Sequence, residues 1–132
     1  MNNKLNKDVD TRDRIVFGIK YNPEAYMGGI RRFKNLTYEE LVKLRDCNFL
    51  DPYDAQNYAP TIEEIMEFMK NHSGFTAHGY VVSPERSNYR LSIEGVEKEG
   101  NITNSDKGAF IELFGDADEL TMDDNWLYCW FD

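Results

Sequence analysis

The sequence predicts an α+β fold, in which an antiparallel sheet of about five strands carries three helices, mostly packed on one face. Two observations predict it: capping boxes that mark helix starts, and short segments in which apolar and polar residues alternate as they do in half-buried strands. The 132 residues and the 41% hydrophobic content suit a single domain, 1–132, with its own core. We expect residues 1–12 to form a polar N-terminal arm of this domain.

The three helices are predicted from the residues at their ends. Thr37 and Thr61 are each followed three residues later by a glutamate, which completes a capping box ahead of an apolar stripe. A third helix is expected to begin between Thr103 and Ser105 and to end at Gly115, because glycine readily terminates helices.

The strands are predicted from alternation and from the turns between them. Four segments before residue 100 have the residue pattern of strands: 14–21, 30–33, 74–82 and 88–96. The second of these, IRRF, is either a short strand or an arm. In the fourth, Leu91 and Ile93 are expected to face inward, and Ser92 and Glu94 outward.

The C-terminal segment GDADELTMDDNWLYCWFD (115–132) predicts a hairpin that turns at Asp123–Asn125. In its second strand Trp126, Tyr128 and Trp130 share one face. The other face carries Leu127, Cys129 and Phe131. A strand that is apolar on both faces is usually internal to a sheet, or meets a partner on one side. We therefore expect these aromatic residues to be core, and the substitution Trp130→Ala to be strongly destabilising.

The net charge of −9 hides an asymmetry along the chain. Residues 1–36 carry eight basic and four acidic residues, net +4, whereas residues 37–132 carry seven basic and twenty acidic residues, net −13. An acidic surface can serve solubility alone, but potentials of this size also steer association with basic partners. The same charge disfavours direct binding to nucleic-acid phosphates.

The sequence also lacks the features of exported and membrane proteins. No stretch approaches the ~20 apolar residues of a membrane helix, and residues 1–14 have no apolar core of the kind found in signal peptides. Cys47 and Cys129 are expected to be buried thiols and not a disulfide. We therefore expect a cytoplasmic protein that does not interact with a membrane.

No motif for metal or cofactor chemistry is complete. A calcium loop that starts at Asp116 would place Leu120 at a ligand position, and one that starts at Asp123 would place Leu127 there. No glycine-rich phosphate loop is present. We predict no metal site, no cofactor and no catalytic residue.

A small enzyme or metal-binding protein is the alternative interpretation. His78 lies in the middle of a predicted strand and could act as a base for Cys129, with carboxylates nearby. His72 and His78, however, do not have the one-face spacing of a zinc-binding helix pair.

The run PTIEEIMEFMKNHSGFTAHGYVVSPERSNYRLSIEGVE (60–97) and the end ADEL…DDNWLYCWFD together resemble small acidic proteins of unknown function carried by bacterial mobile elements. The resemblance covers roughly residues 37–132 and assigns no catalytic or binding residue. It implies a bacterial setting in which small acidic proteins often act as inhibitors or immunity proteins, some by mimicking DNA against restriction or CRISPR nucleases.

These observations predict a non-enzymatic acidic module that binds a basic protein, such as a nucleic-acid-binding enzyme, with carboxylates in place of phosphates. The expected partner-binding residues are the acids of the second helix and of the C-terminal segment: Glu63, Glu64, Glu67, Asp116, Asp118, Glu119, Asp123 and Asp124. A structural homo-oligomer that is joined through the aromatic strand 126–131 is a further alternative.

Overall fold

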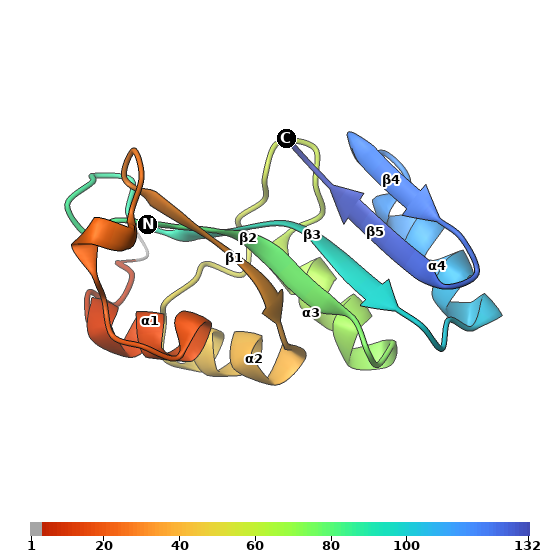
Figure 1. Cartoon of the computed structure of the whole chain (residues 1–132), viewed down its shortest axis with the longest axis horizontal. Coiled ribbons are helices and arrows are strands. Elements are labelled where there is room, and N and C mark those ends of the chain that lie inside the picture. Colours follow the sequence, from red (N-terminus) through yellow and green to blue (C-terminus); the bar gives the residue numbers. More distant parts are fainter. Residues whose placement is uncertain (1–3) are drawn as a thin grey trace.

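The computed structural model describes residues 4–132 and shows a five-stranded antiparallel sheet with α-helices packed against it, which confirms the predicted α+β class (Figure 1). The elements follow one another as α1 (Val9–Phe17), a short 3-10 turn η1 (Pro23–Ala25), β1 (Ile30–Leu36), α2 (Tyr38–Asp46), α3 (Ile62–Asn71), β2 (Thr76–Val82), β3 (Leu91–Glu99), α4 (Asn104–Phe114), β4 (Glu119–Met122) and β5 (Trp126–Trp130). The strands are ordered β1-β2-β3-β5-β4 across the sheet. Among the described residues, no helix combines the length and the apolar character needed to cross a bilayer.

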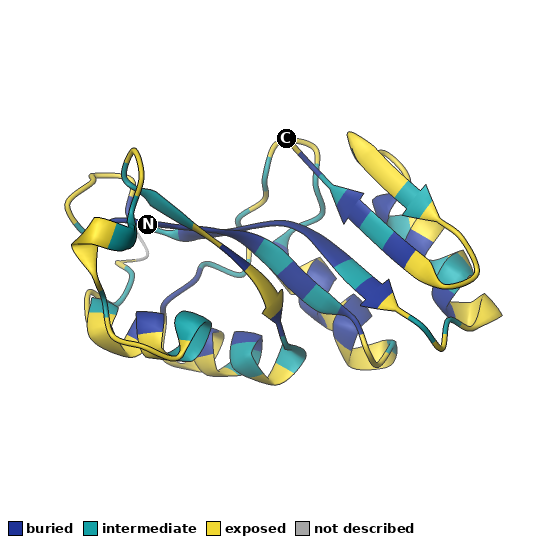
Figure 2. Cartoon of the chain, viewed as in Figure 1, coloured by how far each residue is buried: buried dark blue, intermediate teal, exposed yellow. Residues whose placement is uncertain are grey.

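The helices lie on one side of the sheet, and the core fills the space between the two layers (Figures 1 and 2). Aromatic side chains join the elements there: Phe68 of α3 contacts Phe75 ahead of β2 and Phe114 of α4, with ring centroids 4.7 and 5.1 Å apart. We call the other side, which no helix covers, the open face of the sheet.

The three predicted helices are present, two of them predicted from capping boxes and the third from a start between Thr103 and Ser105. The hydroxyl oxygens of Thr37, Thr61 and Thr103 accept hydrogen bonds from the backbone amides three residues later, at 3.1, 3.1 and 2.9 Å. The acidic side chains at those third positions accept in return from the threonine amides. Each helix start is therefore satisfied by local side chains, as the sequence predicts for Thr37 and Thr61, and Asp106 completes the same arrangement at Thr103.

The prediction of a strand at residues 14–21 is wrong, because residues 14–17 form the end of a fourth helix, α1, and residues 18–21 are irregular. Asp8 caps α1 by accepting from the backbone amide of Thr11 at 3.3 Å and from its hydroxyl at 2.7 Å. Gly18, at φ +78°, ends it in the left-handed conformation that glycine adopts easily. The alternation of Ile15, Phe17 and Ile19 is too short to outweigh these end signals.

The N-terminal segment from residue 4 onward is attached to the domain. The backbone amide of Asn6 donates to the carbonyl of Asn48 at 2.8 Å, and the hydroxyl of Tyr89 donates to the Asn6 carbonyl at 2.7 Å. Further along the chain, in α1, Arg12 and Asp13 are completely buried. Residues 1–3 of the expected arm lie outside the described residues.

A β-bulge changes the direction of side chains along β3. His78 of β2 pairs with Gly95 of β3, but the next residue, Gly79, pairs with Ile93, so that Glu94 is extra. Before the bulge Ile93 faces the helices and Glu94 the open face, as predicted. After it, Val96 lies in the core.

The C-terminal hairpin forms as predicted, and β5 is internal to the sheet because it pairs with both β3 and β4. Leu127, Cys129 and Phe131 are buried in the core. The expectation that the other row is also core is wrong: Trp126, Tyr128 and Trp130 project onto the open face, where Trp126 is 36% exposed. No helix covers that face, so a second apolar row remains accessible.

Candidate functional site

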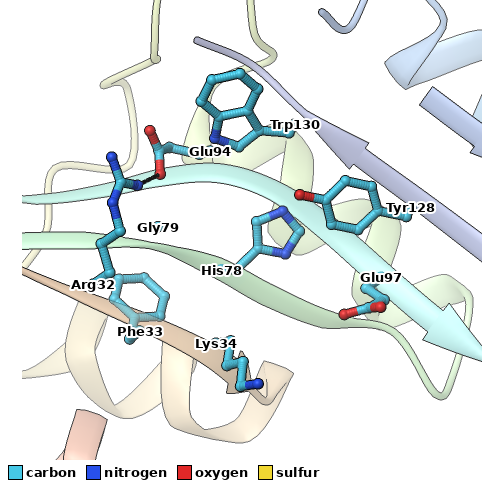
Figure 3. Close-up of a pocket in the computed structure, with 9 residues that line it drawn as sticks. All are labelled: Arg32, Phe33, Lys34, His78, Gly79, Glu94, Glu97, Tyr128 and Trp130. Carbon is cyan, nitrogen blue, oxygen red and sulfur yellow. Dashed lines mark hydrogen bonds and ion pairs between the residues drawn. The ribbon is translucent and has the colours of Figure 1, made fainter. Parts of the chain in front are cut away.

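The open face holds a hollow of about 400 Å³ that spans four of the five strands (Figure 3). Its lining combines aromatic rings, two carboxylates and two basic side chains: Arg32, Phe33, Lys34, His78, Gly79, Glu94, Glu97, Tyr128 and Trp130. In Figure 3 the basic residues come from β1 at one rim and the aromatic residues of β5 stand at the other. The hollow is therefore basic on one side, and aromatic and acidic on the other.

His78 forms the centre of this hollow. Its Nε2 donates to the backbone carbonyl of Cys129 at 2.9 Å, and its ring stacks on Tyr128 with centroids 5.0 Å apart. His78 reaches β5 across Gly95 of β3, where a Cβ atom would lie 1.9 Å from that carbonyl oxygen and 2.7 Å from the histidine nitrogen. Burial lowers the pKa of His78 below its ordinary value, although the hydrogen bond to the Cys129 carbonyl acts in the opposite direction. The ring is therefore neutral at neutral pH.

The structure does not form the suggested pair of His78 as base and Cys129 as nucleophile. His78 contacts the backbone of Cys129 on the open face, whereas the thiol lies in the core on the other face of the sheet. There the Cys129 Sγ is 3.8 Å from the Val96 carbonyl, and burial raises the pKa of the thiol to about 12. A thiol in this state is a poor nucleophile.

The two carboxylates of the hollow have different partners. Glu94, whose side chain is 5% exposed, accepts from Arg32 at 2.5 Å, while the Arg32 side chain is 61% exposed. Glu97 accepts from the indole nitrogen of Trp126 at 2.6 Å. Within residues 4–132, Glu97 forms no ion pair.

Tyr128 lies among carboxylates. Glu97 of β3 and Thr121 of β4 are its register partners, and Glu119 stands opposite Trp130 on the same face. Burial and then the negative charges of Glu119 and Glu97 raise the pKa of Tyr128. The β3-β5-β4 part of the open face is therefore negative around an aromatic row.

The C-terminal acids that were predicted from the sequence to bind a partner lie around the edge strand β4. Asp116 and Asp118 precede β4, Glu119 begins it, and Asp123 and Asp124 form the turn to β5; all five are exposed. Asp124 pairs with Lys107 of α4 at 2.6 Å, and its side chain is 91% exposed.

The acids nominated on α3 are exposed as well, but they lie in the helical layer. Glu64 belongs to the cap of α3. Glu63 and Glu67 share a hollow of about 200 Å³ with Arg45 and Lys70, so basic side chains accompany them. These three acids therefore come from a different layer of the molecule than the C-terminal set.

The other histidine belongs to a buried polar cluster between α3, β3 and α4. Asp106 accepts from Lys98 at 2.8 Å and lies 3.3 Å from the His72 Nδ1. Burial alone would raise the pKa of Asp106, but hydrogen bonds from Lys98 and the Thr103 amide hold it below its ordinary value. The cluster ties the start of α4 to the sheet and exposes little polar surface. In the part of the chain that is described, no three His, Cys, Asp or Glu side chains gather as they would around a metal ion.

The sequence reasoning missed Arg32, Glu94, Glu97, Tyr128 and Trp130 as a candidate site. Alternation along residues 126–131 does indicate that one aromatic row faces away from the core. What it cannot indicate is that β3 lies beside β5, or that an extra residue in β3 turns Glu97 toward the open face. Both depend on pairing between distant segments.

Comparison with known proteins finds no match to this chain among family models, curated proteins or solved structures.

Proposed function

We propose that this chain is a non-enzymatic module that binds a basic protein, of the kind that itself binds nucleic acid, through the acidic edge of its sheet. We define this acidic edge as Asp116, Asp118, Glu119, Asp123 and Asp124. Such a module could act as an inhibitor or immunity protein, in which exposed carboxylates occupy a basic surface otherwise used for phosphates.

The observation that carries the proposal is the combination of charge and apolar exposure at this edge. Leu120 and Met122 of β4 are 38 and 39% exposed on the face of Leu127 and Cys129, and Trp126 of β5 is 36% exposed on the open face, so exposed apolar side chains flank the acidic edge on both faces. Protein interfaces commonly have an apolar centre inside a polar rim, with aromatic residues and methionine enriched. A surface that served solubility alone would not require these large apolar side chains to be exposed.

A pair of variants with equal charge tests the proposal. The edge variant replaces Asp116, Asp118, Asp123 and Asp124 by Asn, which keeps the oxygens that accept backbone hydrogen bonds. The matched control replaces four exposed glutamates elsewhere by Gln: Glu24, Glu39, Glu85 and Glu112. The probe is a short labelled peptide of alternating arginine and glycine, and its binding is measured by fluorescence anisotropy at several salt concentrations.

We expect the edge variant to bind the peptide about tenfold more weakly and with a flatter salt dependence, because four rim ion pairs of ~0.3–0.5 kcal/mol are lost. The control should weaken binding by much less, since it removes the same charge at other places. Equal weakening in both variants would show that only net charge matters, and the proposal would be wrong. Circular dichroism checks that both variants fold.

A further inference from the structure

The open face already binds guanidinium groups from its own chain. Arg32 lies 5.9 Å from the centroid of the Tyr80 ring while it pairs with Glu94. Arg90 lies 5.5 Å from the same ring and donates to its hydroxyl at 2.7 Å. Planar guanidinium groups suit such places because they stack on aromatic faces and donate to oxygen in the same plane.

The other half of the face has the same components, but within residues 4–132 no cation is paired with its carboxylates. On β5 the rings of Trp126 and Tyr128 have centroids 5.5 Å apart, and Trp130 continues the row. Glu97 and Glu119 flank this row from β3 and β4. Neither carboxylate has a lysine or arginine within ion-pair distance among residues 4–132.

We propose that this half of the open face, where Glu97, Tyr128 and Trp130 line the hollow and Glu119 stands beside it on β4, receives an arginine side chain of the basic partner. The guanidinium would lie against the aromatic row of β5 and donate hydrogen bonds to the carboxylates. Arg32 makes the corresponding contacts with the Tyr80 ring and with Glu94 of the neighbouring strand β3. This inference rests on the proposed function, because it names the partner side chain that the acidic edge would bring to the open face.

The basic rim of the hollow does not prevent this. Arg32 already has Glu94 as its partner, and His78 is neutral. Lys34 stands on β1, two strands from β3 and three from β5, or about 10 and 14 Å away at the usual strand spacing. Lys34 lines the same hollow, and 0.1 M salt, with a screening length of about 10 Å, weakens its repulsion of the guanidinium.

The test uses blocked arginine alone, without the rest of the partner. N-acetyl-arginine amide is titrated into the ¹⁵N-labelled protein, and the two indole N–H signals of Trp126 and Trp130 are followed by NMR. N-acetyl-citrulline amide, a neutral molecule of nearly the same shape, is the comparison. We expect the arginine compound to shift the indole signals with an affinity at least about tenfold above that of citrulline, since the charge is needed for both contacts.

Variants locate the contact. The double variant Glu97→Gln with Glu119→Gln should reduce arginine binding about tenfold, whereas Glu112→Gln on α4 should leave it unchanged. Lys34→Gln should strengthen binding by up to about threefold. Glutamine at position 97 can still accept from the Trp126 indole, so the local structure is retained.

The inference is overturned if arginine and citrulline bind equally, or if the double variant binds arginine as well as the unchanged protein. This outcome differs from a failure of the proposed function. If the arginine–glycine peptide responds to the edge variant but blocked arginine does not reach the indoles, the acidic edge binds basic partners without this subsite. If blocked arginine binds but the edge variant does not differ from its control, the arginine subsite is supported and the proposed role of the acidic edge is wrong.

Discussion

At the scale of single residues, charge proved a poor guide to exposure. Arg12 and Asp13 contribute to a polar N-terminal sequence, yet both are fully buried. The Arg12 Nε donates to Asp13 at 2.9 Å, and its two other nitrogens donate to the Val82 carbonyl at 3.0 Å and to the Tyr26 hydroxyl at 2.8 Å. Tyr26 in turn donates to Asp13 at 2.5 Å. Sequence patterns cannot reveal such a closed network, because its partners are spread over seventy residues.

This network predicts a large difference between neighbouring arginines. Arg12→Met leaves Asp13 buried without its cation and should lower the free energy of unfolding by ~3–5 kcal/mol. Arg14→Met, at an exposed position of the same helix, should change it by less than ~0.5 kcal/mol. Urea unfolding of both variants measures this. Similar midpoints would mean that Arg12 and Asp13 are not held in a buried pair.

The two cysteines give a second test at this scale. Cys47 is exposed, against the expectation of burial, and Cys129 is buried. A disulfide-exchange reagent near neutral pH should therefore modify one thiol in the folded protein and the second only after denaturation. Mass spectrometry should identify the first as Cys47. Rapid labelling of Cys129 in the native protein would contradict its position in the core.

Cys129 should also make the protein sensitive to alkali. Burial raises the pKa of its thiol from the ordinary 9.0 to about 12, so the unfolded chain releases this proton at a lower pH than the folded one. Its contribution to stability is complete below pH 9.0 and declines as the pH rises toward 12. Cys129→Ala should remove this part of the pH dependence. An unchanged slope of unfolding free energy against alkaline pH would show that the thiol titrates normally.

At the scale of elements, local signals predicted what local contacts determine. The capping boxes of α2 and α3 were recognisable because donor and acceptor are three residues apart. The cap of α1 uses Asp8 and Thr11 in the same way, but a short alternation in the following residues suggested a strand. The hairpin of β4 and β5 was predicted correctly, and so was the burial of Leu127 and Cys129, whereas the exposure of the opposite face of β5 was not. Which side a helix covers is decided by the assembled fold.

The two faces of β5 lead to a prediction about that element. Leu127 is completely buried, so Leu127→Ala should cost ~2–5 kcal/mol. Trp130 faces the hollow and is only partly buried, so Trp130→Ala should cost less, despite the larger side chain removed. This corrects the expectation from the sequence, in which Trp130 was assigned to the core and Trp130→Ala was expected to be strongly destabilising. Thermal unfolding of both variants decides, and a larger loss for Trp130→Ala would mean that the open face is covered.

At the scale of the whole molecule, the charge asymmetry of the sequence becomes an asymmetry in space. Figure 1 shows α1 and β1 toward one end of the longest axis, and α4 and β4 toward the other. Residues 1–36, net +4, include the edge strand β1, and the acidic edge surrounds the opposite edge strand β4. The sequence predicted the sign and location of these charges along the chain. That they lie at opposite edges of one sheet follows only from the strand order.

This arrangement predicts a salt dependence that is not monotonic. At very low salt, where screening extends to about 30 Å, the net charge of −9 should dominate and copies should repel one another. Near 0.1 M salt, screening of about 10 Å leaves only the facing ends in contact, and the basic β1 edge of one copy should attract the acidic edge of the next. Such head-to-tail contact does not close on itself, so it should remain weak and give no fixed oligomer. The second virial coefficient from light scattering should therefore pass through a minimum at intermediate salt.

Two double variants test this explanation. Arg31→Gln with Lys34→Gln removes two basic residues from β1 and should abolish the minimum. Lys43→Gln with Lys70→Gln makes the same change in net charge on the helices and should keep it. A coefficient that simply falls with added salt in all three proteins would show that the two ends do not act separately.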